Sequence, residues 1–375
     1  MHTTPQSTTE LAAVLKEAAA AGKTIETGGA FSKRAMGGGG PTSAEPVGAV
    51  ISLASMTRVL EYEPNDLTIS VEAGLKWKAF QDLLAANRQM VPLDPPYYDE
   101  ATVGGVLAAN TCGARRRLYG SVRDAVIGMK FVSVSGEVIQ SGGMVVKNVA
   151  GLDMGKLMIG SFGTLGVIGE ANFKLTPVPP ASATFLERGV SLEAVMKRRN
   201  EILASVLQPT AIDLVRTADG AWTLALQVGA TERVVERYRR ELSKAEALEG
   251  AAEAEFWCGI REFTPNWLRA NPGGAVARAS VSLQDVGPAL ATLPSATQSV
   301  ARAGNGVIYA AFTEAQAAET WVKASPHHAV IEAAAPASSL ERWPRPGNAL
   351  AVMEQIKRMF DPANLLNRGR LYGRL

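Results

Sequence analysis

The sequence has 375 residues, of which 47% are hydrophobic and 20% charged. These values exclude a single small module and a mainly disordered chain, and the length predicts two domains or one large domain with a cap. The formal net charge of +2 excludes the strongly basic surface of a dedicated nucleic-acid binder.

Cysteine and histidine are too sparse for a disulfide framework or a zinc site. The two cysteines, Cys112 and Cys258, are far apart, and the histidines are limited to His2, His327 and His328, so we expect an intracellular chain without a bound metal. The first ten residues lack a secretion signal, and no run of about 18 apolar residues occurs. We therefore expect a cytoplasmic protein that reaches the inner membrane face, if at all, only through partners.

The first half of the chain predicts an α+β unit. Ser7 and Glu10 form a capping box before a helix that ends at Gly22. The elements expected next are strands at 24–26, 47–53 and 67–73, a helix containing Trp77 and Phe80, and a hairpin over 131–139. A Pro-rich join at 177–180 predicts that this domain covers residues 1–178.

The second half predicts a smaller domain with an antiparallel sheet that helices cover on one face. The expected strands are 222–228, 275–282, 307–312 and 329–333, and the expected helices are 231–247, 285–293 and 314–323. We assign residues 179–348 to this cap domain. Residues 349–375 form a C-terminal segment, with a helix over 350–360 that Asp361-Pro362 stops.

The loop Thr27–Lys33 is the first candidate for a phosphate site. Its glycines can release consecutive main-chain N–H groups toward an anion, and Ser32 can add a hydroxyl donor. A plain strand-to-loop turn is the alternative, and the glycine run at 37–40 predicts a flexible loop. No G-x-G-x-x-G stands between a strand and a helix, and the segment 151–157 imitates a Walker loop but is one residue short.

Residues 92–179 carry an ordered series of motifs. These are T-V-G-G followed by small residues and Asn, Y-G-x-x-R-D, a hairpin with S-G-E, K-N-x-x-G-x-D, G-S-x-G-T-L-G-V-I, and a final T-P. Together with the upstream G-G loop and V-E-A-G at 71–74, the series resembles the FAD-binding domain of the vanillyl-alcohol oxidase and p-cresol methylhydroxylase superfamily. A line of small residues suits an extended FAD, because the backbone can then approach the pyrophosphate and ribityl chain.

The resemblance implies a noncovalently bound FAD and a set of contact residues. It implies that the pyrophosphate lies on Gly28, Gly29, Ala30, Phe31 and Ser32, and that the ribityl chain and flavin follow Pro95, Thr102, Val103, Gly104, Gly105, Ala109, Asn110, Thr111 and Gly113. It further implies that Gly120, Arg123 and Asp124 organise the pyrophosphate region and that Val167 and Ile168 reach the adenine. Cys112 lies in the right segment for a covalent link, but a small apolar filler beside Gly113 is the interpretation that we favour.

The second half resembles the C-terminal domain type of FAD-linked oxidases. The tail F-D-P-A-N-L-L-N-R-G-R resembles F-D-P-x-x-x-x-N-P-G-K, which implies that Asn367 and Arg370 return to the flavin. Related enzymes that oxidise 2-hydroxy acids carry H-A-G-D-G-N-x-H, and here Arg302 and Tyr309 replace the two histidines. Because Arg and Tyr do not replace imidazole as metal ligands, we expect no metal site here. Arg302 and Tyr309 are the candidate catalytic residues.

These features together resemble the FAD-binding E subunit of glycolate oxidases. The resemblance implies two partners, a larger FAD-containing D-type subunit and an iron–sulfur F-type subunit, and a small 2-hydroxy acid as substrate. Two alternatives stay open: an autonomous FAD-dependent D-2-hydroxy-acid dehydrogenase, with Arg34, Arg116, Arg278 and Arg302 as candidate carboxylate clamps, and a non-catalytic assembly subunit with a relict flavin pocket.

Overall fold

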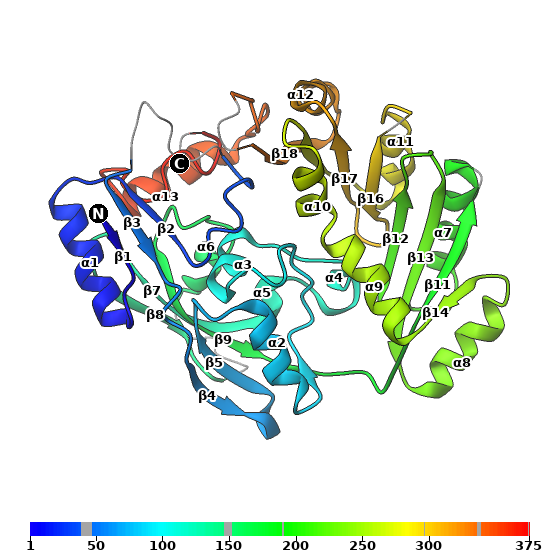
Figure 1. Cartoon of the computed structure of the whole chain (residues 1–375), viewed down its shortest axis with the longest axis horizontal. Helices are drawn as coiled ribbons and strands as arrows, with labels where there is room; N and C mark the ends of the chain where they lie inside the picture. The colour runs from blue at the N-terminus through cyan, green and yellow to red at the C-terminus, as the bar shows by residue number, and fades with distance from the viewer. Residues whose placement is uncertain (39–46, 146–151, 190, 296, 336–338, 374) are drawn as a thin grey trace.

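A computed structural model describes residues 1–38, 47–145, 152–189, 191–295, 297–335, 339–373 and 375. Two sheet systems lie side by side (Figure 1). Residues 39–40 of the expected flexible loop and residues 147–151 of the K-N-x-x-G-x-D motif lie outside the described residues.

The first system contains two main sheets. A parallel sheet has the order β1 (His2–Thr3), β3 (Ala49–Ser52) and β2 (Ile25–Gly28), and an antiparallel sheet has the order β4 (Val59–Glu63), β5 (Thr68–Glu72), β9 (Val167–Lys174), β7 (Val126–Val132) and β8 (Val138–Gly142). A short pair joins β6 (Gln89–Met90) to β10 (Thr176–Pro177). The expected hairpin is confirmed as β7 and β8, which meet at Gly136 with a φ of 82°.

Helices cover these sheets. They are α1 (Thr8–Ala20), α2 (Trp77–Ala85), α3 (Val103–Ala109), α5 (Val122–Ala125) and α6 (Gly155–Met158). The short helix α4 (Arg116–Tyr119) instead contacts the strand Ala211–Arg216 of the second system. The Ser7 hydroxyl accepts the Glu10 N–H at the start of α1, as the capping pattern predicts. Trp77, Phe80 and Phe173 pack edge-on or tilted in the core, which seats α2 against β9.

The second system is one antiparallel sheet of eight strands. Its order is β14 (Glu246–Leu248), β11 (Ala181–Gly189), β13 (Trp222–Ala230), β12 (Ala211–Arg216), β16 (Gln298–Arg302), β17 (Val307–Phe312), β15 (Ala275–Ser280) and β18 (His328–Ala334). The α+β class, with a flavin-type domain followed by an antiparallel sheet domain, is confirmed. The strands β11, β12 and β16 are additional to those expected, and 246–248 is a strand where a helix end was expected.

Helices lie on both faces of this sheet, and not on one face as the sequence suggested. α7 (Leu192–Ala204), α8 (Glu232–Glu241), α11 (Val286–Ala291) and α12 (Ala315–Ala324) pack on one face, while α9 (Gly250–Arg261) and α10 (Phe263–Ala270) occupy the other. The alternation along β11 explains this, because Ala183 and Phe185 enter the apolar core whereas Ser182 and Thr184 donate hydrogen bonds to Glu253 of α9.

The chain finally returns to the first system. After α13 (Ala349–Phe360), Leu366 forms a parallel bridge with Ile25 of β2, so the C-terminal segment extends the small parallel sheet. The Ile25 N–H donates to the Leu365 carbonyl at 2.8 Å, and the Asn367 N–H donates to the Ile25 carbonyl at 2.8 Å. This pairing carries Asn367 and Arg370 to the loop that follows β2.

Candidate functional site

The loop after β2 presents a row of main-chain donors. None of the N–H groups of Gly29–Lys33 donates a hydrogen bond to an acceptor among the described residues, and Phe31 has a φ of 54°. A left-handed residue within such a row turns successive N–H groups toward one point, where they form a concave anion site.

The start of α3 touches this loop, because a Cβ on Gly29 would overlap the Thr102 side chain, and both residues line one cavity. Thr102 caps the helix by accepting the Gly105 N–H at 3.3 Å. A Cβ on Gly104 would lie 2.9 Å from the Ala73 Cβ, whereas a Cβ on Gly105 would meet only the Thr102 hydroxyl, at 3.3 Å. Gly104 therefore permits helix-to-strand packing, and Gly105 keeps the cavity open.

We call this space the loop cavity. The sequence-predicted residues that line it are Gly28, Gly29, Ala30, Phe31, Ser32, Thr102, Gly104, Gly105, Ala109, Val167, Ile168, Asn367 and Arg370. Residues from β2, α3, β9 and the C-terminal segment meet here, although they are widely separated in sequence.

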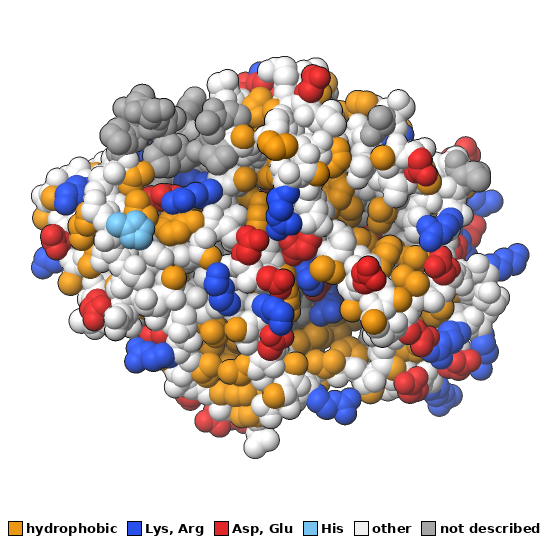
Figure 2. All heavy atoms as spheres, viewed as in Figure 1, with side chains coloured by type: hydrophobic (Ala, Val, Ile, Leu, Met, Phe, Trp, Pro, Cys, Tyr) orange, Lys and Arg blue, Asp and Glu red, His pale blue; other side chains and the backbone are white. Residues whose placement is uncertain are grey.

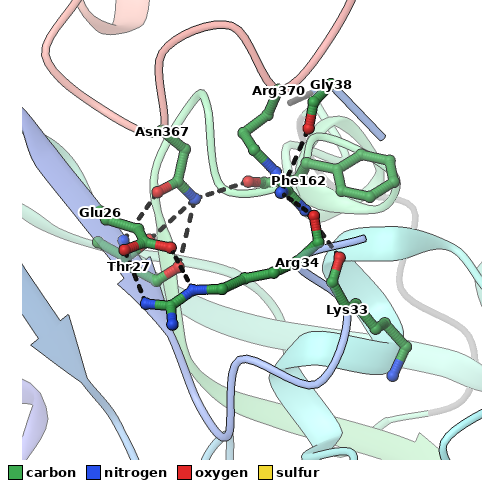
Figure 3. A network of polar contacts seen from close by, with 8 residues as sticks. All are labelled: Glu26, Thr27, Lys33, Arg34, Gly38, Phe162, Asn367 and Arg370. Carbon is green, nitrogen blue, oxygen red and sulfur yellow. Dashed lines mark hydrogen bonds and ion pairs between the residues drawn. The ribbon is translucent and has the colours of Figure 1, made fainter. Parts of the chain in front are cut away.

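The C-terminal residues brace the cavity wall (Figure 3). The Asn367 side chain accepts the Thr27 N–H at 2.7 Å and donates to the Phe162 carbonyl at 2.7 Å. The Arg370 guanidinium donates to the carbonyls of Lys33 and Arg34, each at 3.0 Å, and burial lowers the Arg370 pKa to about 10. Since these carbonyls hold the guanidinium, the visible role of Arg370 is to fix the loop.

Lys33 is a buried cation in the same wall that the site prediction omitted. It is 8% exposed, its Nζ has no hydrogen-bond partner among the described residues, and burial lowers its pKa to about 7. The only signal in the sequence is its position directly after Ser32 at the end of the glycine loop.

A second cavity of about 330 Å³ lies between the first system and the eight-stranded sheet. We call it the sheet cavity; it shares Ala109 and Phe162 with the loop cavity. The sequence-predicted residues that line it are Ala109, Asn110, Thr111, Gly113, Arg302 and Tyr309, together with Arg116 and Arg278 from the set of carboxylate clamps. The surface is hollowed between the two domains, and basic side chains are visible in the hollow (Figure 2).

The floor of the sheet cavity is one face of neighbouring strands. Tyr309 of β17 is opposite Arg278 of β15, which is in turn opposite Val330 of β18. Arg278 donates to Glu332 at 2.8 Å and to Ser280 at 3.1 Å. Side chains of the same face therefore assemble a basic, hydrogen-bonding surface.

Arg302 and Tyr309 have different electrostatic situations. Arg302 forms a buried ion pair with Asp213, while the Tyr309 hydroxyl makes no hydrogen bond with a described residue, and burial raises its pKa to about 12. Tyr309 is thus a neutral donor across the physiological pH range. His328, which opens β18 and lies in the same cavity, has a pKa lowered by burial and by Arg278.

Five predicted residues line neither cavity. Pro95, Val103, Gly120, Arg123 and Asp124 are absent from both walls. Asp124 is exposed and accepts the Ser121 N–H at 2.7 Å, so it caps α5, and Val103 is fully buried in the core. Capping and core packing therefore account for Asp124 and Val103 without a cofactor.

The residues of the loop cavity fit a dinucleotide flavin. Unpaired N–H donors and a glycine that keeps the space open suit a diphosphate joined to an apolar ring system. Among the described residues no group of three or more His, Cys, Asp and Glu side chains could hold a metal ion. No helix in the described parts of the chain has both the length and the apolar character to cross a membrane.

Comparison with known families decides the nature of the first domain. Residues 2–142 match the family model described as FAD binding domain. Residues 2–142 thus form an FAD-binding domain similar to those of the p-cresol methylhydroxylase type. This confirms the resemblance that the motifs of this FAD-binding domain carry.

Several curated proteins are similar to parts of the chain. It is 38% identical over 205 residues to the glycolate oxidase subunit GlcE of Escherichia coli strain K12, covering 54% of this chain and 55% of that protein. It is 35% identical over 148 residues to D-2-hydroxyglutarate dehydrogenase of Xanthomonas citri pv. viticola, covering 40% and 31%. The chain thus spans about half or less of the length of these relatives.

A solved structure shows the same fold over almost the whole chain. Alkyldihydroxyacetonephosphate synthase superposes with a TM-score of 0.69 at 18% identity, covering 98% of this chain and 75% of that one. At this identity the likeness establishes the architecture of both domains and no more.

Proposed function

We propose that this chain binds FAD noncovalently in the loop cavity and is the FAD-binding subunit of a glycolate oxidase complex that converts a 2-hydroxy acid to a 2-oxo acid. The observation that carries the proposal is that the two cavities adjoin: Ala109 and Phe162 line both of them. A dinucleotide lying along the loop cavity would present its ring system to a ligand in the sheet cavity.

The sheet cavity suits a small carboxylate. Arg116, Arg278 and Arg302 line it, and guanidinium groups bind carboxylates through paired N–H donors. Glu332 and Asp213 already hold Arg278 and Arg302, so these two arginines keep only part of their donors for a ligand. Arg116 is exposed and completes the basic wall.

The remaining polar groups suit a hydroxyl next to that carboxylate. In the alternative of an autonomous dehydrogenase, Tyr309 would donate a hydrogen bond to the substrate, and His328, whose pKa is lowered, would accept the proton that leaves the hydroxyl. When bound, FAD would supply the two-electron acceptor for the carbon–hydrogen bond.

The partners follow from relatives. Similarity to the E. coli subunit GlcE supports assembly with a larger D-type flavoprotein and an iron–sulfur F-type subunit, and hence a hetero-oligomer placed in the cytoplasm or at the inner membrane face through those partners. We propose residues 1–178, 179–348 and 349–375 as the folding units, with the first limit between β10 and β11.

The decisive experiment is anaerobic mixing of the purified, FAD-reconstituted chain with glycolate or D-lactate. We expect the flavin spectrum to persist with the chain alone and to bleach once the D-type partner is added. Bleaching without a partner would instead establish the autonomous dehydrogenase. The arginines and Tyr309 that line the sheet cavity support this alternative.

Two further measurements test whether the chain binds FAD and whether the binding is noncovalent. Failure to acquire flavin absorbance after reconstitution would favour the relict assembly subunit. Yellow colour that stays with acid-precipitated protein would contradict noncovalent binding.

A further inference from the structure

A further space lies where the two sheet systems meet. It consists of two adjoining hollows of about 260 and about 300 Å³, and Arg115, Ser182 and Gln227 line both of them. We call these two hollows the junction cavity. The smaller hollow also adjoins the sheet cavity, because Arg261 and Arg302 line both. A ligand in the junction cavity would therefore be a neighbour of a substrate in the sheet cavity.

Gln227 of β13 is a buried carboxamide without a hydrogen-bond partner. The residue is 7% exposed, and its side chain makes no hydrogen bond with a described residue. Its main-chain carbonyl accepts the Thr210 N–H at 2.7 Å, so the side chain alone lacks a partner. Neither its side-chain oxygen nor its nitrogen is fully enclosed, and the carboxamide therefore reaches the space that it lines. A buried carboxamide costs free energy unless something in that space supplies its hydrogen bonds.

Arg115 presents a poorly satisfied guanidinium in the same wall. Its Nη1 donates to the Met90 sulfur at 3.5 Å, and its Nε lies 3.5 Å from the Asp94 carboxylate. Its Nη2 makes no hydrogen bond with a described residue. A thioether is a weak acceptor, and 3.5 Å is long for a charge-assisted hydrogen bond. Because the side chain is 33% exposed, the guanidinium is accessible to a ligand.

Two tyrosine hydroxyls add to these donors. Tyr98 and Tyr119 line the larger hollow, and neither hydroxyl makes a hydrogen bond with a described residue. Burial raises the pKa of both phenols, so each keeps its proton across the physiological pH range. Both are therefore available as neutral donors.

The acids that line the junction cavity already have donors. Asp82 pairs with a lysine of its own helix at 2.6 Å, Asp94 lies against Arg115, and Glu253 accepts two hydroxyls of β11. Among the described residues, three arginines and three acids line the cavity, so its net charge does not identify a ligand. The ligand is instead defined by the groups that lack a hydrogen-bond partner.

These groups are mainly donors, and they favour a ligand that accepts hydrogen bonds. A carboxylate offers two coplanar oxygens, which match the paired N–H groups of a guanidinium and can accept further donors. The Gln227 amide and the two phenols supply such donors in the cavity that Arg115 lines. A cation would meet the arginines, and an apolar ligand would leave the donors unpaired.

We propose that the junction cavity binds a small carboxylate, which the Arg115 guanidinium and the Gln227 carboxamide hold together. The proposal goes beyond the proposed function and requires no bound FAD. The carboxylate can come from two sources: a separate small acid, or the far end of a dicarboxylic 2-hydroxy acid whose other end lies in the sheet cavity. Both sources make the same contacts with Arg115 and Gln227.

Calorimetric titration of the full-length chain with propionate and with glutarate, both without and with FAD, tests the site. We expect a binding event whose dissociation constant rises about tenfold or more in Arg115→Met and in Gln227→Leu, because each variant removes donors to the carboxylate. The matched controls are Arg240→Met and Gln355→Leu, which alter exposed side chains on α8 and α13 and should leave this event unchanged.

Arg278→Lys distinguishes the two sources, because Arg278 lines the sheet cavity and not the junction cavity. If one dicarboxylic acid spans both cavities, glutarate binding should weaken in Arg278→Lys as well as in Gln227→Leu. If a separate acid binds, Arg278→Lys should not affect the event. Either result supports the site and identifies the source.

Stability separates a ligand site from a structural role. Because the Gln227 carboxamide has no partner in the described protein, Gln227→Leu should not lower the melting temperature of the chain; a clear fall would make Gln227 structural. Should Arg115→Met fold poorly, Arg115→Lys takes its place. Equal affinity in wild type and Gln227→Leu would overturn the proposal, as would a wild type that binds neither acid or binds inorganic phosphate equally well. Carboxylate binding by a chain that takes up no FAD would overturn only the proposed function.

Discussion

The Asn367 carboxamide joins the C-terminal segment to Thr27, the residue that precedes the glycine loop. It accepts the Thr27 N–H at 2.7 Å and donates to the Thr27 hydroxyl at 3.2 Å. Because the same carboxamide also donates to the Phe162 carbonyl at 2.7 Å, one side chain holds three separate parts of the cavity wall.

We predict that Asn367→Ala destabilises the chain by about 1–3 kcal/mol, since it leaves buried N–H and carbonyl groups unpaired. FAD affinity should fall as well, because the loop loses its anchor. Chemical denaturation and FAD titration measure the two effects. Asn266→Ala, which alters an exposed contact with Arg269, should change neither, and unaltered stability of Asn367→Ala would refute the bracing role.

The neighbouring glycines at the start of α3 should respond differently to one methyl group. Gly105→Ala places a Cβ in the cavity with only the Thr102 hydroxyl nearby, whereas Gly104→Ala meets the Ala73 Cβ at 2.9 Å. We expect Gly105→Ala to keep the apoprotein melting temperature and to weaken FAD binding, and Gly104→Ala to lower the melting temperature by overpacking. The same FAD affinity in Gly105→Ala and wild type would remove Gly105 from the set of cofactor contacts.

Tyr309→Phe removes one hydroxyl from the sheet cavity. If this donor binds the substrate, the rate of flavin reduction by 2-hydroxy acid should drop about tenfold or more, with FAD affinity unchanged. Stopped-flow reduction of the complete complex is the measurement. Tyr62→Phe, in which the lost hydroxyl donates to Gln89 far from both cavities, is the control; reduction as fast in Tyr309→Phe as in Tyr62→Phe would exclude the role.

The stability of the apoprotein should increase with pH because of Lys33. Its pKa is about 7 in the folded chain and 10.5 in the unfolded chain, so above pH 7 the unfolded state binds more protons. The free energy of unfolding should therefore rise by about 1–3 kcal/mol between about pH 7 and about pH 9. Lys33→Met should remove that increase; the same slope in both proteins would show that Lys33 keeps an ordinary pKa.

The buried pair Lys357 and Asp361 should stabilise the C-terminal turn. The Lys357 Nζ lies 2.6 Å from Asp361 and donates to the Thr164 carbonyl at 2.7 Å, and Asp361 accepts the N–H groups of Leu365 and Leu366. Lys357→Met should cost about 3–5 kcal/mol in unfolding free energy, because the carboxylate is left buried without its counter-charge. Urea denaturation tests this; a change below about 1 kcal/mol would contradict it.

Short-range patterns in the sequence predicted several local elements and the resemblance to an FAD-binding domain. The capping box of α1, the periodicity of α2 and the β7–β8 hairpin depend on interactions between residues close in the chain, which pattern reasoning can follow. The glycine loop and the T-V-G-G turn indicated an FAD-type domain because close approach of backbone to a cofactor demands small side chains at fixed positions.

Which of these residues share a cavity depends on contacts between distant segments of the chain. Asp124 belongs to a motif that the resemblance connects with the pyrophosphate, yet it caps α5, whereas Lys33 carried almost no signal and lies buried without a partner. A residue is buried, and finds its hydrogen-bond partners, through contacts with segments that are far apart in sequence. The pairing of Ile25 with Leu366, which carries Asn367 to Thr27, is such a contact, and no local pattern specifies it.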